Sequence, residues 1–118
     1  MKKRFIVKKN DEFNEIIRTC PSVKDSNLVI YYKDSTLPYD RYGISAGTKL
    51  GHAVVRNLYK RRLRMIINQN KNNYENFKDY IIIIRKNCLN VEYDDIQRSY
   101  CSLMKKIHRV NKGDINET

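Results

Sequence analysis

The sequence predicts an α+β fold in which helices cover a central β-sheet. Three observations support it. Residues 27–33 are dense in β-branched and aromatic side chains, and residues 41–47 alternate larger with small side chains; both patterns favour strands. Residues 78–86 contain four consecutive isoleucines, as in a strand that is buried on both faces. Helical patterns surround these segments. A chain of 118 residues has room for one modest hydrophobic core, so we expect one domain spanning residues 1–118.

The first nine residues form a basic arm with an apolar triplet at 5–7. A helix is expected after the arm, because Asn10 or Asp11 suits the N-cap and Glu12 suits the first turn. Pro21 ends this helix, since the residue before a proline disfavours helical geometry. The apolar face of the helix has i, i+3, i+4 spacing: Phe13, Ile16 and Ile17.

The predicted strand at 41–47 has two different faces. One face carries the larger side chains Tyr42, Ile44 and Ala46. The other carries only small residues, which let a neighbouring element approach closely: Gly43, Ser45 and Gly47. A turn at 34–40 separates this strand from the strand at 27–33. A hairpin between the two strands is therefore the simplest pairing.

The second half of the chain begins with a helical pattern over 49–67, followed by an asparagine-rich loop at 68–76. The isoleucine strand at 78–86 is expected in the centre of the sheet, because both of its faces are apolar. A last helix is expected over 94–110, with acidic residues at its start and basic residues near its end, as the helix dipole favours. The tail at 111–118 is expected to be frayed.

The composition points to an anionic partner. The formal net charge is +11, and charge repulsion of that size destabilises a compact state unless a partner neutralises it. Nucleic acid is the first candidate and an anionic membrane surface the second. No apolar run is long enough to span a bilayer and no secretory signal is recognisable, so we expect a cytoplasmic protein. The three widely spaced cysteines predict neither a disulfide framework nor a zinc site.

The segment 49–67 carries six Lys or Arg residues, and no Asp or Glu occurs between Asp40 and Glu75. On a helix with about 100° per residue, one side is apolar: Val55, Tyr59, Leu63 and Ile66, with Leu58 at the edge. The opposite side is polar and basic: Arg56, Asn57, Lys60, Arg61 and Arg64. A solvated helix face usually mixes both signs of charge to form i,i+4 pairs. The absence of acidic residues therefore favours a nucleic-acid backbone as partner.

Arg62 departs from this division, because it falls within the apolar stripe one turn after Leu58. We expect its aliphatic stem to carry the guanidinium group outward to solvent. Guanidinium groups on such a helix suit bidentate phosphate contacts, and Asn57 can hydrogen-bond to sugar or base.

The same segment resembles the arginine–asparagine–arginine signature of the bacterial ribonuclease P protein subunit. The matching positions are Lys49, Gly51, Ala53, Val54, Arg56, Asn57, Lys60, Arg61 and Arg64. Leu58 stands where the family usually has its second arginine, and Arg62 stands where the family is commonly apolar. The segments KKNDEF, NLVIYY, RYGISAGTK and DYIIIIRK also fit in order, so the resemblance covers nearly the whole chain.

This resemblance implies a single-domain αβββαβα sandwich, similar to the second domain of a small-subunit ribosomal protein. It also implies a left-handed βαβ crossover around the basic helix, against the usual right-handed rule. A fourth strand would be short, near residues 22–24. The implied function is to partner a catalytic RNA that removes the 5′ leader of precursor tRNA. In this family the RNA and its bound Mg²⁺ perform the phosphodiester hydrolysis, so we expect a non-catalytic protein with no metal of its own, monomeric when free.

The resemblance also implies two RNA-binding regions. A cleft between the sheet and the first helix would hold the single-stranded leader, lined by Phe13, Ile17 and Tyr31. From periodicity alone, ordinary helix-to-sheet packing explains Phe13 and Ile17 about equally well. The expected contacts of the basic helix with RNA are Lys49, Arg56, Asn57, Lys60, Arg61, Arg62 and Arg64. Lys8 and Lys9 are candidate phosphate contacts.

One alternative stays open, and two others have less support. A general RNA-binding or ribosomal-protein-like module without a nuclease role would share the sheet-and-helix plan. Catalysis by the protein itself has little support, because His52 and His108 lack a nucleophile or carboxylate at a telling spacing. Membrane binding is disfavoured, since the basic helix shows no broad exposed apolar face.

Overall fold

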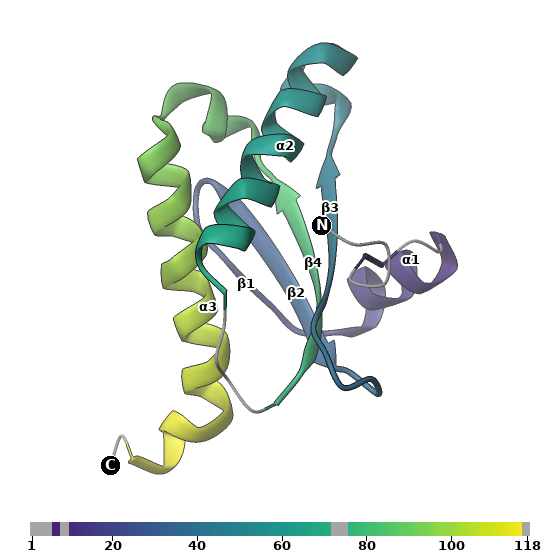
Figure 1. Ribbon diagram of the computed structural model, residues 1–118, viewed down its shortest axis with the longest axis vertical. Helices are drawn as coiled ribbons and strands as arrows, with labels where there is room; N and C mark the ends of the chain where they lie inside the picture. Colours follow the sequence, from purple (N-terminus) through teal and green to yellow (C-terminus); the bar gives the residue numbers. More distant parts are fainter. Residues whose placement is uncertain (1–5, 8–9, 72–75, 117–118) are drawn as a thin grey trace.

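The computed structural model describes residues 6–7, 10–71 and 76–116, and in this part of the chain three α-helices pack on a four-stranded sheet (Figure 1). Two short 3₁₀ helices, η2 and η3, precede α2 and α3. The elements in chain order are α1 (Asn10–Thr19), β1 (Ser22–Lys24), β2 (Leu28–Asp34), β3 (Arg41–Ala46), η2 (Thr48–Leu50), α2 (Ala53–Gln69), β4 (Lys78–Ile84), η3 (Lys86–Asn90) and α3 (Tyr93–Asn116). The predicted α+β sandwich is confirmed, including the short strand at 22–24.

The strand order is β1-β2-β4-β3, so the predicted hairpin between β2 and β3 is wrong. β4 lies between them, antiparallel to β2 and parallel to β3, with Ile82 opposite Ile30 and Ile44. The central position predicted for the isoleucine strand is confirmed. The burial of the β4 side chains explains this central position. Tyr80, Ile81 and Ile82 are fully buried, and only an interior strand covers such residues from both faces while pairing both of its edges.

The crossover from β3 through α2 to β4 is left-handed. In Figure 1 both strands run upward, α2 lies on the viewer's side of the sheet, and β4 stands to the left of β3. A right-handed crossover with the helix on the viewer's side would place β4 to the right. The handedness implied by the family resemblance is therefore present in this chain.

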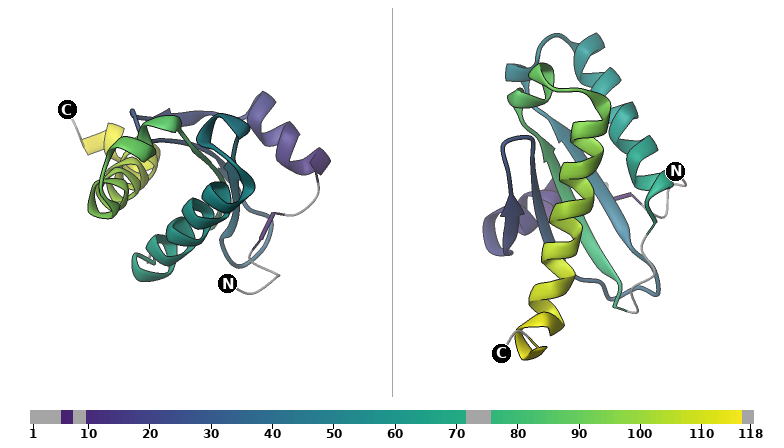
Figure 2. Two further views of the ribbon diagram at one scale, coloured as in Figure 1. Left: turned by 90° about the horizontal axis from the view of Figure 1, so that it is seen from above. Right: turned by 90° about the vertical axis from the view of Figure 1, so that its left-hand side faces the viewer.

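The two faces of the sheet carry two separate cores. Helices α2 and α3 cover one face and α1 the other, as the view from above shows (Figure 2). The larger core combines side chains of β2 and β4 with those of α2 and α3, among them Leu28, Ile30, Ile82, Leu63, Ile66, Tyr100 and Leu103. The smaller core lies under α1 and contains Val7, Ile16 and Ile81. Because side chains alternate along a strand, neighbouring residues of β4 serve different cores.

The chain ends differ from expectation in one respect. α3 runs to Asn116, so the expected frayed tail at 111–118 is helical over most of its length. Nothing local stops the helix at Val110, because no proline follows and Gly113 weakens a helix by only about 1 kcal/mol. At the other end, Val7 is buried and its N–H donates to the Tyr42 carbonyl at 3.0 Å, which ties the N-terminal arm to β3. No helix in the described part of the chain is long and apolar enough to cross a membrane.

Asn27 joins three elements at the end of the sheet. Its side chain donates to Ser99 Oγ on α3 at 2.9 Å and accepts from Asn87 on η3 at 2.8 Å. The Cys88 thiol donates to the Asn27 carbonyl at 3.2 Å. Cys88 is fully buried. Burial, followed by the charge of Asp25, raises the pKa of this thiol to about 11.

This environment predicts that Cys88 is chemically inert in the native protein. At pH 8 its thiolate fraction should be about 200-fold lower than that of the same thiol in the unfolded chain, whose pKa is about 8.5. Pulsed alkylation followed by mass spectrometry should therefore label Cys88 only in denaturant, while the partly exposed Cys20 and Cys101 serve as internal controls. The raised pKa also implies that stability falls as the pH rises from about 8.5 to about 11, because the unfolded thiol ionises first. Native labelling of Cys88 at the rate of Cys20 would contradict the prediction.

Candidate nucleic-acid interface

A glycine that the local geometry requires lies between η2 and helix α2. Gly51 has φ 137°, a conformation that residues with a side chain rarely adopt, and a Cβ there would also press on Val55 at 3.3 Å. His52 is the N-cap residue, and its side chain makes no hydrogen bond to the first turn of the helix. The first turn also contains no acidic residue. At the other end, the Asn70 side chain donates to the Ile66 carbonyl at 2.8 Å and closes the helix.

Helix α2 has a buried apolar side and an exposed polar side, as the sequence predicts. The boundary between the two sides differs from the prediction. Leu63 and Ile66 are buried as expected, and Ile67, which the helical wheel had not singled out, is buried beside them. Val55 and Tyr59 are half-buried. The exposed members of the polar side are Asn57, Arg61 and Arg64, and Lys49 is exposed on η2 shortly before the helix.

Arg56 and Lys60 lie at the margin of α2 rather than on its exposed side, since both are half-buried. Arg56 Nε donates to the Gly51 carbonyl at 3.2 Å, so this side chain also links the helix to the backbone just before it. That contact engages one of five N–H groups, and the other four can still meet an anion.

Arg62 is half-buried and lies against a neighbouring aromatic side chain. Its guanidinium carbon lies 5.1 Å from the centre of the Tyr59 ring, a cation–π contact between residues three apart on the helix. Tyr59 itself packs against the larger core. Arg62 is therefore positioned along the edge of α2, with its charge held against an aromatic face.

A second candidate surface lies on the opposite face of the sheet, under α1. Phe13 and Ile17 of α1 and Tyr31 of β2 come together around the smaller core, and all three remain partly exposed. Tyr32 instead packs against the larger core, so Tyr31 is the tyrosine on the α1 side. The structure thus brings the three predicted cleft residues into one place.

Gly43 allows this close packing. A Cβ at Gly43 would lie 2.8 Å from Ile81 Cδ1, closer than Cβ atoms are found to approach, and 3.0 Å from Phe13 Cε2, so both side chains would have to shift. Of the small face predicted for this strand, Gly43 is the place where α1 approaches β3, whereas a Cβ at Gly47 would have no neighbour within 4 Å. The aromatic ring of Phe13 rests directly on the backbone of the sheet.

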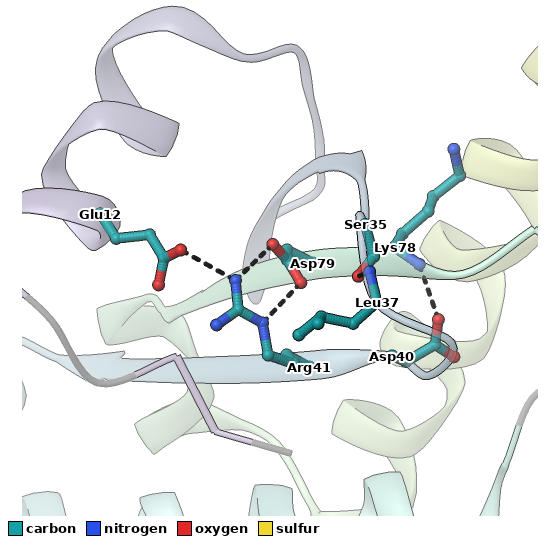
Figure 3. A network of polar contacts seen from close by, with 7 residues as sticks. All are labelled: Glu12, Ser35, Leu37, Asp40, Arg41, Lys78 and Asp79. Atoms are coloured by element: carbon teal, nitrogen blue, oxygen red, sulfur yellow. Dashed lines mark hydrogen bonds and ion pairs between the residues drawn. The ribbon is translucent and has the colours of Figure 1, made fainter. Parts of the chain in front are cut away.

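A buried ion-pair network holds α1 on the sheet (Figure 3). Arg41 of β3 donates to both carboxylate oxygens of Asp79 on β4, at 2.9 and 2.7 Å, and to Glu12 of α1 at 2.9 Å. The Asp79 side chain is only 2% exposed. Its hydrogen bond, followed by that of Glu12, raises the pKa of Arg41 further above its usual value. Because Glu12 precedes Phe13 in α1, this network also positions the candidate cleft.

Sequence reasoning missed this network, although Asp79, next to Lys78 at the start of a strand that then becomes apolar, was a signal that it needs a partner. Lys78 is similar: its side chain is 3% exposed, with Nζ 2.7 Å from Asp34 Oδ1. Asp40 accepts from the Lys78 backbone N–H at 2.8 Å, so it closes the turn before β3 (Figure 3). Among the described residues, no group of three or more His, Cys, Asp or Glu side chains could hold a metal ion.

The two histidines lie in different environments. His52 is exposed at the start of α2, whereas His108 is buried, with Nε2 3.0 Å from the Tyr80 hydroxyl in the larger core. Lys8 and Lys9, predicted as phosphate contacts, lie outside the described residues.

Comparisons with known proteins agree with one another. The family model described as Ribonuclease P matches residues 1–108. A ribonuclease P protein component from Mycoplasma mycoides is 45% identical over 91% of this chain and 99% of its own length. One from Bacillus cereus is 37% identical over 90% of this chain and 93% of its own length.

Solved structures show the same fold. The Staphylococcus aureus RNase P protein superimposes with a TM-score of 0.79 at 32% identity, over 87% of this chain and 94% of that one. The protein from Thermotoga maritima has a TM-score of 0.76 at 25% identity, over 85% of this chain and 94% of that one.

Proposed function

This chain belongs to the ribonuclease P protein family, and we propose that α2 binds the catalytic RNA of that ribonucleoprotein while the α1 side of the sheet binds the single-stranded 5′ leader of precursor tRNA. The observation that carries the first half is the exposed side of α2. It presents Asn57, Arg61 and Arg64 beside Lys49, and the sequence places no acidic residue between Asp40 and Glu75. Such a surface has cations that nothing on its own helix neutralises, as phosphate binding requires.

The second half of the proposal rests on the partly exposed apolar cluster of Phe13, Ile17 and Tyr31. Single-stranded nucleic acids bind where aromatic side chains provide stacking surfaces next to positive charge. Helix-to-sheet packing alone would also place these residues together. Their remaining exposure is what makes them available to a leader.

In this proposal the protein contributes binding, and the RNA partner with its Mg²⁺ supplies the hydrolytic chemistry. The protein acts as a monomer in the cytoplasm, and its substrate is precursor tRNA. A general RNA-binding module would share the basic helix but would be indifferent to a 5′ leader.

Reconstitution with the cognate ribonuclease P RNA at low Mg²⁺ tests this function. We expect the protein to raise turnover of precursor tRNA and to bind precursor tRNA more tightly than mature tRNA in the complex. Protein freed of RNA should not cleave precursor tRNA with Mg²⁺ present. Robust cleavage without RNA would overturn the non-catalytic role, and equal affinity for both tRNAs would favour the general RNA-binding module.

Phe13→Ala tests the leader-binding surface. Losing one stacking surface should cost about 1–3 kcal/mol in binding of precursor tRNA, roughly 5- to 150-fold in affinity, with little effect on mature tRNA. Parallel affinity measurements on reconstituted holoenzyme with the two tRNAs give this difference directly. Because Phe13 also packs against the smaller core, the Tm of the variant must be measured alongside. Equal weakening for both tRNAs would show that Phe13 is not a leader contact.

A further inference from the structure

The outermost line of α2 is more apolar than its charge suggests. Val54, Leu58, Arg61 and Met65 follow i, i+4, i+7, i+11 spacing and so lie along one stripe of the helix. Val54 is 80% exposed and Met65 47% exposed, while Leu58 is half-buried. We refer to these four residues as the outer stripe.

The outer stripe is not part of the core. α2 contacts the sheet through its opposite side, where Leu63, Ile66 and Ile67 are buried. Isolated exposed apolar residues are common on protein surfaces. Here, however, two of the most exposed large apolar side chains in the described part of the chain share one helical line with a third apolar residue.

The surroundings of the outer stripe are polar or cationic. Asn57 and Arg64 flank it on one side and Arg62 on the other, and Arg61 lies within it. A partner must therefore present negative charge and an apolar surface within a few ångströms of each other. A second copy of this chain, with a formal net charge of +11, is repelled from such a surface.

Resting on the proposed binding of RNA by α2, we propose that the outer stripe packs against unpaired nucleotides of the RNA partner, with Val54, Leu58 and Met65 contacting base or ribose faces. Continuous A-form duplex offers phosphates and 2′-hydroxyls at its surface, but its base faces are stacked inside. Unpaired nucleotides expose those flat apolar faces, and their flanking phosphates lie within reach of the neighbouring arginines. α2 therefore recognises a single-stranded or bulged segment rather than a uniform helix.

The test separates apolar from ionic contributions by their salt dependence. Val54→Ala combined with Met65→Ala removes exposed apolar surface and places alanine, the best helix former, at both positions. Affinity for the cognate ribonuclease P RNA should fall about tenfold at every salt concentration, which corresponds to roughly 55 Å² of lost apolar contact. The slope of log K against log salt should not change, since no phosphate contact is lost.

Phe77→Ala is the matched control, because Phe77 is 40% exposed and lies outside α2. It should bind RNA like the unaltered protein. Dimethyl sulfate probing of the RNA should show unpaired adenines or cytosines that the unaltered protein protects and the double variant does not.

Unchanged affinity of the double variant, or a change in its salt slope alone, would overturn the proposal. So would sedimentation showing that the unaltered protein self-associates through this stripe and the variant does not. If the unaltered protein fails to bind the RNA at all, the proposed function itself fails, which is a distinguishable result.

Discussion

Replacement of Arg41 by methionine is expected to lower the free energy of unfolding by about 3–5 kcal/mol. Arg41 provides the two hydrogen bonds to Asp79 shown in Figure 3, and that carboxylate is almost completely buried. Without Arg41, a buried charge loses its partner, and Glu12 loses its link between α1 and the sheet. Urea denaturation followed by circular dichroism measures the change. Since α1 carries Phe13, weakened leader binding should accompany the loss of stability.

Two further variants make this expectation specific. In Arg41→Met combined with Asp79→Leu, both charges are gone, and much of the lost stability should return because no buried carboxylate remains unpaired. Arg98→Ala removes an ion pair with Asp95 that is exposed to solvent, and should change stability by less than about 1 kcal/mol. A loss for Arg41→Met as small as that for Arg98→Ala would contradict the structural role of the network.

Replacing Arg61 and Arg64 together by alanine is expected to weaken binding of the catalytic RNA by about a hundredfold near physiological salt. Each lost charge-assisted hydrogen bond costs about 1.5 kcal/mol or more. The slope of log K against log salt should become shallower by about one unit for each arginine, because fewer counterions are released from the RNA. Both side chains are exposed, so the Tm should hardly change.

The chain offers a charge-matched control for this experiment. Lys105 and Lys106 are exposed on α3, and replacing both by alanine lowers the net charge by the same amount. If the location of the charge on α2 matters, this control keeps nearly the full salt slope. An equal loss in both double variants would show that overall charge, rather than the surface of α2, binds the RNA.

The candidate site was predictable in part, and the individual residues show why. The periodicity of α2 correctly separated Leu63 and Ile66 from Arg61 and Arg64, because burial of one helix face is a local pattern. The periodicity placed Arg56 on the polar side of α2, but the Nε of this residue donates a hydrogen bond to the Gly51 carbonyl just before the helix. It also could not foresee that Arg62 would lie on Tyr59, since a wheel gives directions but not side-chain conformations.

The sequence alone determined the local properties of this protein: which segments are strands, which side of α2 is buried, and where Gly43 admits a close neighbour. Only the tertiary structure decided which strands are neighbours. Alternation and β-branching indicate which faces of a strand are buried, but they carry no information on which strands pair. The position of β4 between β2 and β3 could therefore not be predicted from these patterns. The same holds for Arg41, whose partners lie 29 and 38 positions away and become neighbours only when α1, β3 and β4 have assembled.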